Sequence, residues 1–163
     1  MVTLIVVLGV LIAAYMAWNI GANDVANAMG TSVGSGALTL RRAIIVAAVF
    51  EFLGAVLFGS HVTDTIRKGV LTFDESEMDE YSEQLMYGFM AALLAAAIWL
   101  TVATKWGRPV STNHSIVGGV IGMGLYIHPA AVNWGKVLEI VLSWVASPLL
   151  GGILAFGSFW VIK

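Results

Sequence analysis

The 163-residue sequence is 59% hydrophobic and only 11% charged, and its formal net charge at pH 7 is −2. Soluble domains carry about 25% charged residues, so this composition excludes an ordinary soluble domain and predicts a helical membrane protein. The small net charge gives no reason to expect a nucleic-acid partner, and the absence of cysteine excludes disulfides and thiolate metal sites.

Four long apolar runs and one shorter run follow one another along the chain. Each long run can cross a bilayer as a helix, which needs about 20 mainly apolar residues. The shorter run is rich in glycine and completes a span only if its polar neighbours lie at membrane depth. The first run lacks the positively charged start of a signal peptide, so we expect a retained helix. The long runs cover 2–18, 43–58, 85–104 and 137–162, and the shorter run covers 116–127.

The distribution of charge predicts the orientation, because Lys and Arg in short loops favour the cytoplasmic side. Arg41 and Arg42 follow the first run, and Lys105 follows the third. The connection 61–84 is strongly acidic, and we place it outside as an extramembrane connection, more as a solvated loop than as an interfacial helix. The N-terminus then lies outside and the C-terminus inside. We therefore predict an all-α, polytopic protein of the cell membrane, with about five spans in one transmembrane domain over residues 1–163.

The segment 18–40 follows the first apolar run directly and contains no Lys, Arg or Pro. A continuous helix over 2–40 would be about 58 Å long, whereas a hydrocarbon core is about 30 Å thick. We therefore expect a broken helix. Broken helices at membrane depth are tolerated only where they line a cavity or are buried in protein, so the break itself indicates a functional region. Four glycines offer places for it: Gly21, Gly30, Gly34 and Gly36.

Four polar residues recur at every fourth position of this segment, so wherever the segment is helical they form one stripe. Asp24 flanks the stripe. Amide and hydroxyl oxygens with one carboxylate suit a desolvated alkali cation, and broken transporter helices bind Na⁺ or H⁺ in a comparable way. Asparagines that only hydrogen-bond neighbouring helices are the alternative, but three of them beside an aspartate favour an ion or substrate site. The stripe consists of Asn19, Asn23, Asn27 and Thr31.

A second polar segment reads PVSTNHS from Pro109, and four glycines follow it closely. Pro109 can begin a helix. Ser111, Thr112 and Asn113 are favourable N-cap residues. A helix N-terminus at membrane depth presents free N–H groups and a positive dipole end, which suits an oxyanion. His114 could carry a proton, hydrogen-bond an anion, or be a packed core histidine.

Glu51 lies near the centre of the second apolar run. An unpaired carboxylate there costs about 2.5–3.5 kcal/mol even on the insertion scales that give low values. Arg41 and Arg42, which precede this run, lie more than two helical turns away from Glu51. A functional role is therefore the first hypothesis for Glu51, and a structural pair with another intramembrane group is the alternative.

Together these residues resemble the inorganic phosphate transporter (PiT) family. The string GANDVANAMGTSVGSGALT at 21–39, Glu51, and RPVSTNHSIVGG at 108–119 carry the resemblance, which covers essentially the whole chain as the N-terminal half of a usual member. Members are symporters that move phosphate with Na⁺ or H⁺, and they are built from two inverted halves that each carry both motifs. The resemblance implies one half of an inverted-repeat transporter here, and an odd number of spans agrees with an inverted second half.

The resemblance also implies a site made from both motifs. The asparagines and the aspartate of the first motif would bind the cation and contribute to the substrate site, and the hydroxyls and helix N–H groups of the second would bind phosphate. The acidic residue of the second run matches a family residue important for phosphate transport. The phosphate ligands are assigned as Ser111, Thr112, Asn113, Asp24, Glu51 and His114. The Na⁺ ligands are assigned as Asn23, Asp24, Asn27, Thr31, Ser111 and Thr112.

The hypothesis that follows is secondary active transport of inorganic phosphate by alternating access, with Na⁺ favoured over H⁺, without a cofactor and without enzymatic activity. The expected partners are phosphate, the cation, lipid, and a second half from the same or a separate chain, in an oligomer. One alternative is an intramembrane serine hydrolase with Ser35 as nucleophile and His114 as base. A passive ion channel and a structural membrane subunit are the others.

Overall fold

The structure is a computed structural model of residues 2–65 and 69–163, with the side chains of 61–68 excepted. Within these ranges the chain forms helices joined by short connections, and Leu71 pairs with Val132 in an isolated antiparallel bridge. The predicted all-α fold is confirmed. The two basic residues of the acidic connection, Arg67 and Lys68, lie outside the described residues.

Four helices in the described part of the chain are long and apolar enough to cross a membrane, and they coincide with the four long apolar runs. A further helix, α4 (Thr112–Ile127), forms from the glycine-rich run. Its 16 residues reach about 24 Å, less than a hydrocarbon core of about 30 Å, so the fifth crossing stays a prediction. The long helices are α1 (Val2–Gly34), α2 (Leu40–Thr65), α3 (Glu75–Lys105) and α5 (Trp134–Ile162), and a short 3-10 helix, η2 (Pro129–Ala131), follows α4.

The chain separates into two compact units, Met1–Val132 and Asn133–Lys163. The second unit consists of α5. The side chain of Asn133 caps it by accepting a hydrogen bond from the N–H of Lys136 at 3.0 Å, and no residue of α5 is buried. An apolar helix of 29 residues without a buried side chain is suited to lipid or further protein as its surroundings. The single domain over 1–163 stays a prediction.

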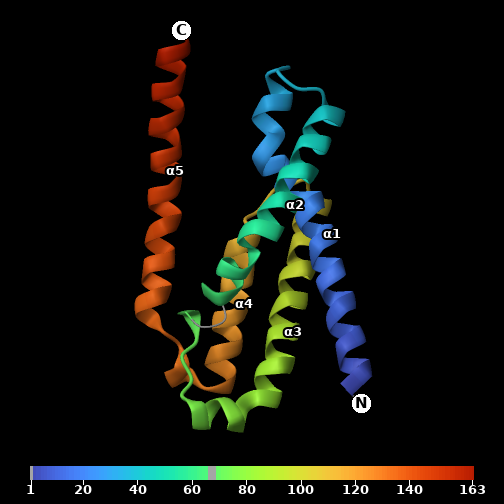
Figure 1. The fold of residues 1–163 in the computed structure, drawn as a ribbon, viewed down its shortest axis with the longest axis vertical. Coiled ribbons are helices and arrows are strands. Elements are labelled where there is room, and N and C mark those ends of the chain that lie inside the picture. Colours follow the sequence, from blue (N-terminus) through green and yellow to red (C-terminus); the bar gives the residue numbers. More distant parts are fainter. Residues whose placement is uncertain (1, 66–68) are drawn as a thin grey trace. The chain divides into compact units, whose positions relative to one another are not determined.

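In the first unit α3 packs against both α1 and α4, and α1 also contacts α2 (Figure 1). A buried cluster lies at the contact of α1 and α3: Met16 packs with Ala96, Ala97 and Leu100. Val110, from the connection after α3, packs against the same cluster. This apolar contact holds the C-terminal half of α3 beside the polar stripe of α1.

Helices α3 and α4 approach each other closely through small residues. A Cβ atom on Gly119 would lie 3.1 Å from the backbone oxygen of Ala92 and 3.3 Å from its Cα. The neighbouring atoms belong to a helix backbone and cannot move aside as the end of a flexible side chain could. Small residues that let helix backbones approach are a common basis of helix packing in lipid, where burial of apolar surface gives little driving force.

Helix α1 continues without interruption through Gly21 and Gly30 and ends at Gly34. In the turn that follows, Gly36 has a φ of +77°, a conformation that glycine adopts without strain. The expected break is therefore confirmed at Gly34 and Gly36 and wrong at the two earlier glycines. A glycine inside a helix costs only about 1 kcal/mol relative to alanine, so the packing of the flanking turns can carry a helix through it.

The acidic residues from Glu75 onward form the first turns of α3, so the expected loop is wrong for 75–84. The Asp74 side chain accepts a hydrogen bond from the N–H of Glu77 at 2.8 Å, and the Glu77 side chain accepts one from the N–H of Asp74 at 3.0 Å. This capping box satisfies two backbone N–H groups, and the helix dipole favours carboxylates in the first turn. Figure 1 shows that these first turns run in a different direction from the rest of α3.

The start of α3 is tied to the residues that follow α4. The Nε2 atom of His128 lies 3.3 Å from Glu77 Oε1, and its ring stacks on Tyr81 with the ring centroids 5.5 Å apart. Beside it, the N–H of Thr72 donates to the carbonyl of Ala131 at 2.8 Å. These contacts fix the N-terminal end of α3 against the C-terminal end of α4.

Gly119→Leu should destabilise the protein by about 1–3 kcal/mol, because a side chain at Gly119 would overpack against the backbone of Ala92. Gly122→Leu is the matched control on the same helix, since a Cβ atom there meets nothing within 4 Å. Thermal unfolding of both variants and the wild type in detergent measures the difference. An equal loss in the two variants would contradict the close contact of α3 and α4.

The pKa of Asp74 is lowered, first by the hydrogen bond from the N–H of Glu77 and then by the Ser76 hydroxyl. A lowered carboxylate pKa means that the ionised group stabilises the folded helix start at neutral pH and that this contribution is lost as the pH falls through that pKa. Amide hydrogen exchange at the start of α3, corrected for intrinsic rates, should therefore show weaker protection in acid. Asp74→Asn keeps a cap without a charge, so its acid response should be smaller. An acid response as large as that of the wild type would assign the effect to another group.

Candidate functional site

The polar stripe of α1 is buried along its first part and exposed along its second. Asn19 and Asn23 are 3% and 2% exposed, whereas Asn27 and Thr31 are exposed. The buried part lies against the C-terminal half of α3 and the connection that leads into α4. The first two asparagines are therefore interhelical hydrogen-bond partners, which is the alternative that the sequence had left open.

Asn19 is held by Tyr15 and Thr101. Its Nδ2 atom donates to the carbonyl oxygen of Tyr15 at 2.9 Å, and its Oδ1 atom accepts from the Thr101 hydroxyl at 2.7 Å. The Tyr15 hydroxyl forms a further hydrogen bond with Thr101 Oγ1. Both the oxygen and the nitrogen of this buried amide thus have partners, as buried polar groups generally do.

Asn23 and Asn27 bracket the backbone of Val110. Asn23 Oδ1 accepts from the N–H of Val110 at 2.9 Å, and Asn27 Nδ2 donates to the carbonyl oxygen of Val110 at 3.1 Å. Asn23 Nδ2 donates to the Thr104 hydroxyl at 2.9 Å. Two asparagines one turn apart on α1 thus satisfy both backbone polar groups of a residue 87 and 83 positions away.

Asp24 lies beside this bracket and is partly buried. Its Oδ1 atom accepts a hydrogen bond from Asn27 Nδ2 at 3.2 Å. The described residues leave lone pairs on the carboxylate and on Asn27 Oδ1, and such oxygen atoms are the ligands that hard cations prefer. Thr31 lies one turn further along α1, and its hydroxyl has no hydrogen-bond partner in the described chain.

Helix α4 begins where the sequence predicts a helix N-terminus. Ser111 is the N-cap, and its Oγ atom accepts from the N–H of His114 at 3.3 Å. Thr112 is 6% exposed, and its Oγ1 atom has no hydrogen-bond partner among the described residues. Asn113 and His114 are exposed, and His114 lines an open hollow of about 340 Å³ with residues of α3 and α4. Because buried hydroxyls without a partner are uncommon, Thr112 is the strongest pointer to a ligand in this region.

Two other predicted residues are not joined to these contacts. Glu51 is exposed on α2, and it has no hydrogen-bond or ion-pair partner among the described residues. Ser35 follows α1, and its hydroxyl donates to the carbonyl oxygen of Ser32 at 3.3 Å. In that geometry the Ser35 proton points at the backbone, whereas a hydrolase nucleophile needs it directed at a general base.

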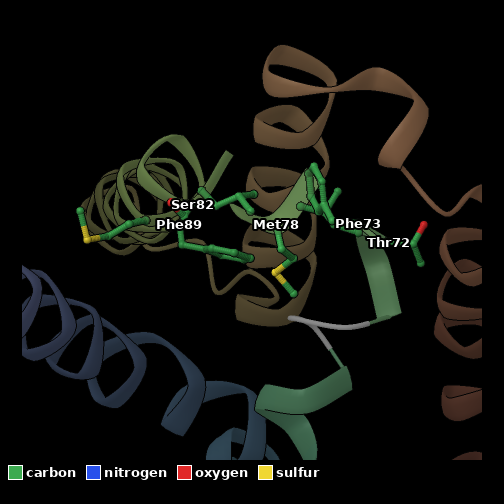
Figure 2. Close-up of a pocket in the computed structure, with 8 residues that line it drawn as sticks. Thr72, Phe73, Met78, Ser82 and Phe89 are labelled. Atoms are coloured by element: carbon green, nitrogen blue, oxygen red, sulfur yellow. The ribbon is translucent and has the colours of Figure 1, made fainter. Parts of the chain in front are cut away.

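A larger cavity, of about 550 Å³, lies at the start of α3 (Figure 2). Phe73 and Phe89 belong to its mainly apolar wall, and Thr72 and Ser82 add hydroxyl groups. Phe89 and Thr104 are 15 residues apart, which corresponds to about 22 Å along a helix. None of the predicted site residues lines this cavity, so cavity size alone does not identify the site.

The partners of the stripe were not predicted from the sequence. Thr101 and Thr104 are visible there as two hydroxyls three residues apart in an uncharged apolar run, and that spacing places them on one helix face. Such a pair could have signalled a contact with the stripe of α1. Nothing marks Val110, because it contributes backbone atoms, which every residue but proline offers alike.

Thr101→Val should destabilise the protein by about 1–3 kcal/mol, because it leaves the Oδ1 atom of buried Asn19 without its donor. Thr101→Ser keeps the hydroxyl and is the matched control. Thermal unfolding in detergent compares both variants with the wild type. If valine and serine at this position cost the same, the hydroxyl does not contribute to stability.

The sequence of this chain is similar to those of known proteins. A model described as the phosphate transporter family matches residues 20–163. The chain is 52% identical over 149 residues to a provisionally named phosphate permease of Pyrococcus abyssi, covering 91% of this chain and 36% of that protein. It is 53% identical over 144 residues to the inorganic phosphate transporter 2-1, chloroplastic, of Arabidopsis thaliana, covering 87% and 24%.

The fold of this chain is also similar to that of a solved structure. It is described as the sodium-dependent phosphate transporter, and it superimposes with a TM-score of 0.86 at 50% identity. The match covers 97% of this chain and 39% of that one. The chain therefore spans between 24% and 39% of the length of these three proteins.

Proposed function

The chain belongs to the phosphate transporter family, and from this membership we propose that it is part of a secondary active transporter that moves inorganic phosphate across the cell membrane together with a cation. The description of the similar structure as sodium-dependent supports Na⁺ rather than H⁺ as that cation. Because the chain covers only 39% of that structure, we propose that a second half, in the same or a separate chain, completes the site.

The observation that carries this proposal is the meeting of the two polar segments. Asn27 Nδ2 contacts both the Asp24 carboxylate and the Val110 carbonyl, and Val110 directly precedes Ser111, the N-cap of α4. Thr112 follows, with a buried hydroxyl that has no partner in the described chain. Oxygen ligands for a cation and hydrogen-bond donors for an oxyanion are thus gathered in one region.

Phosphate would bind at the N-terminus of α4. The first turn of a helix has N–H groups without intrahelical acceptors and a positive dipole end, and both attract an oxyanion. Ser111 and Thr112 would add hydroxyl donors, and Asn113 and His114 would add side-chain donors from the exposed side of the same turn. These donors are mostly neutral, so they bind the anion without supplying a full compensating charge.

The cation would bind at Asp24, with Asn27 Oδ1, Thr31 and the hydroxyls of Ser111 and Thr112 as further ligands. A cation beside the phosphate offsets its negative charge, so each ligand would raise the affinity for the other. This coupling is a binding free energy and is equal in both directions. It gives the physical basis for driving phosphate uptake with a cation gradient.

Alternating access would occur by rocking of the two inverted halves about this central site, with the N-terminus of the chain outside and its C-terminus inside. Glu51 would then have a role at the contact with the second half. It is exposed in the described chain, and a carboxylate that faces lipid is costly. A surface of the second half would give it a polar partner and explain its place in an apolar helix.

Two rival functions are a serine hydrolase and a passive ion channel. A hydrolase would not use the Asn27–Asp24 contact, and the Ser35 hydroxyl is bonded to the backbone. A passive ion channel would use the same ligands but would not couple two fluxes. Dependence of phosphate flux on an imposed Na⁺ gradient separates a channel from a transporter.

Labelled phosphate uptake into proteoliposomes at fixed pH, with and without an inward Na⁺ gradient, tests the proposal on the complete transporter. The wild type should take up phosphate faster with the gradient, and Asp24→Asn should weaken this acceleration because the carboxylate charge is lost. Uptake that ignores the gradient in the wild type, or an unchanged gradient response in Asp24→Asn, would contradict the proposed coupling.

Thr112→Val should raise the half-saturating phosphate concentration by about tenfold or more, because it removes a buried hydroxyl from the site. Thr112→Ser keeps the hydroxyl and should retain most of the affinity. The same uptake assay, run over a range of phosphate concentrations, measures both. Equal affinities in the valine and serine variants would remove Thr112 from the site.

A further inference from the structure

We propose that Asn23 is a positioning residue rather than a cation ligand, and that Asn23, Asn27 and Thr104 form a clamp that holds Val110 and thereby sets the position of the N-terminus of α4. This inference rests on the proposed function, because the clamp acts on the helix end that would bind phosphate. Thr104 was not among the predicted site residues, and it enters the site only as the partner of Asn23.

The burial and bonding of Asn23 argue against a ligand role. Its Oδ1 atom already accepts from the N–H of Val110, its Nδ2 atom donates to Thr104, and the residue is 2% exposed. A cation at this oxygen would have to enter a closed contact between α1 and α3. Asn27 differs, because it is exposed and only its Nδ2 atom is engaged in the described chain. Asn27 can therefore both clamp Val110 and bind a ligand through Oδ1.

The connection itself explains why a clamp is needed. Helix α3 ends at Lys105, Gly107 turns the chain after it with a φ of +66°, and Pro109 has no N–H group. Val110 thus has the first N–H group after the proline, just before the N-cap of α4. An N–H group that is shielded from water and has no acceptor is unfavourable, and Asn23 supplies the acceptor for this part-buried one. The peptide groups of Val110 and Ser111 are adjacent, so holding Val110 also holds the start of α4.

The Val110 N–H can only donate, so it sets which way the Asn23 amide points, and Thr104 holds the other end of that amide. With Nδ2 donating to the Thr104 hydroxyl, Oδ1 faces the N–H of Val110. A flipped amide would place two donors against each other at Val110. Removing the Thr104 hydroxyl leaves Asn23 Nδ2 without this acceptor and loosens the amide, without touching a group that would contact phosphate or the cation.

The experiment uses the complete transporter in proteoliposomes, first with the outside Na⁺ concentration that saturates the wild type and then with a higher one. Thr104→Val should raise the half-saturating phosphate concentration by about tenfold, since it weakens a part-buried hydrogen-bonded contact, and Asn23→Leu should raise it at least as much. Thr104→Ser keeps the hydroxyl and should stay near the wild type. A weakened cation ligand can be compensated by more Na⁺, but a displaced helix start cannot. Recovery of either variant at higher Na⁺ would overturn the clamp.

Amide hydrogen exchange of the peptide that contains residues 108–113, measured without phosphate, gives a readout that does not depend on transport. Exchange should be faster in Asn23→Leu and Thr104→Val and unchanged in Thr104→Ser. Thr72→Val, the same substitution at the other end of the unit, controls for a general loss of stability and should leave this peptide unchanged. Unchanged exchange in Asn23→Leu would overturn the clamp. Faster exchange in a protein whose wild type does not transport phosphate would support the clamp and reject the proposed function.

Discussion

The backbone of Val110 needs hydrogen-bond partners that the connection between α3 and α4 does not supply, and two asparagines of α1 supply them. A polar backbone group shielded from water is costly to leave unpaired, and the cost rises as the surroundings become less polar. This requirement links segments that are 83 and 87 positions apart. The course of α1, the path of the connection and the start of α4 are therefore parts of one arrangement.

Helix α3 makes this arrangement possible because it contacts both partners at once. On one side its residues Ala96, Ala97 and Leu100 bury Met16 of α1, and on the other Ala92 lies against the backbone of Gly119. Burial of apolar surface drives little helix association in lipid, so close packing of small residues and interhelical hydrogen bonds have to hold the helices together. Both kinds of contact are present on α3.

The sequence was sufficient where the signal is local. The bilayer sets the length of the apolar runs, and the N-cap at Ser111 follows from its own side-chain chemistry. The start of α3 also has a local signal, the capping box of Asp74 and Glu77, but the acidic run around it favours a solvated loop on charge alone. The bonding of Asn23 could not be predicted, because a period of four shows which residues share a helix face and not what that face meets.

Three asparagines at equal spacing thus have different chemistry, and the difference comes from burial. In Asn19 and in Asn23, the oxygen and the nitrogen of the side-chain amide are both hydrogen-bonded within the fold. Binding an ion there would first break contacts that hold the helices together. Asn27 Oδ1 and the Thr112 hydroxyl retain hydrogen-bonding capacity in the described chain. A transported ion must bind and leave repeatedly. Ligand atoms that make no hydrogen bond within the fold can bind and release an ion without loosening the helices. Side-chain atoms that are fully hydrogen-bonded within the fold keep those ligand atoms in place.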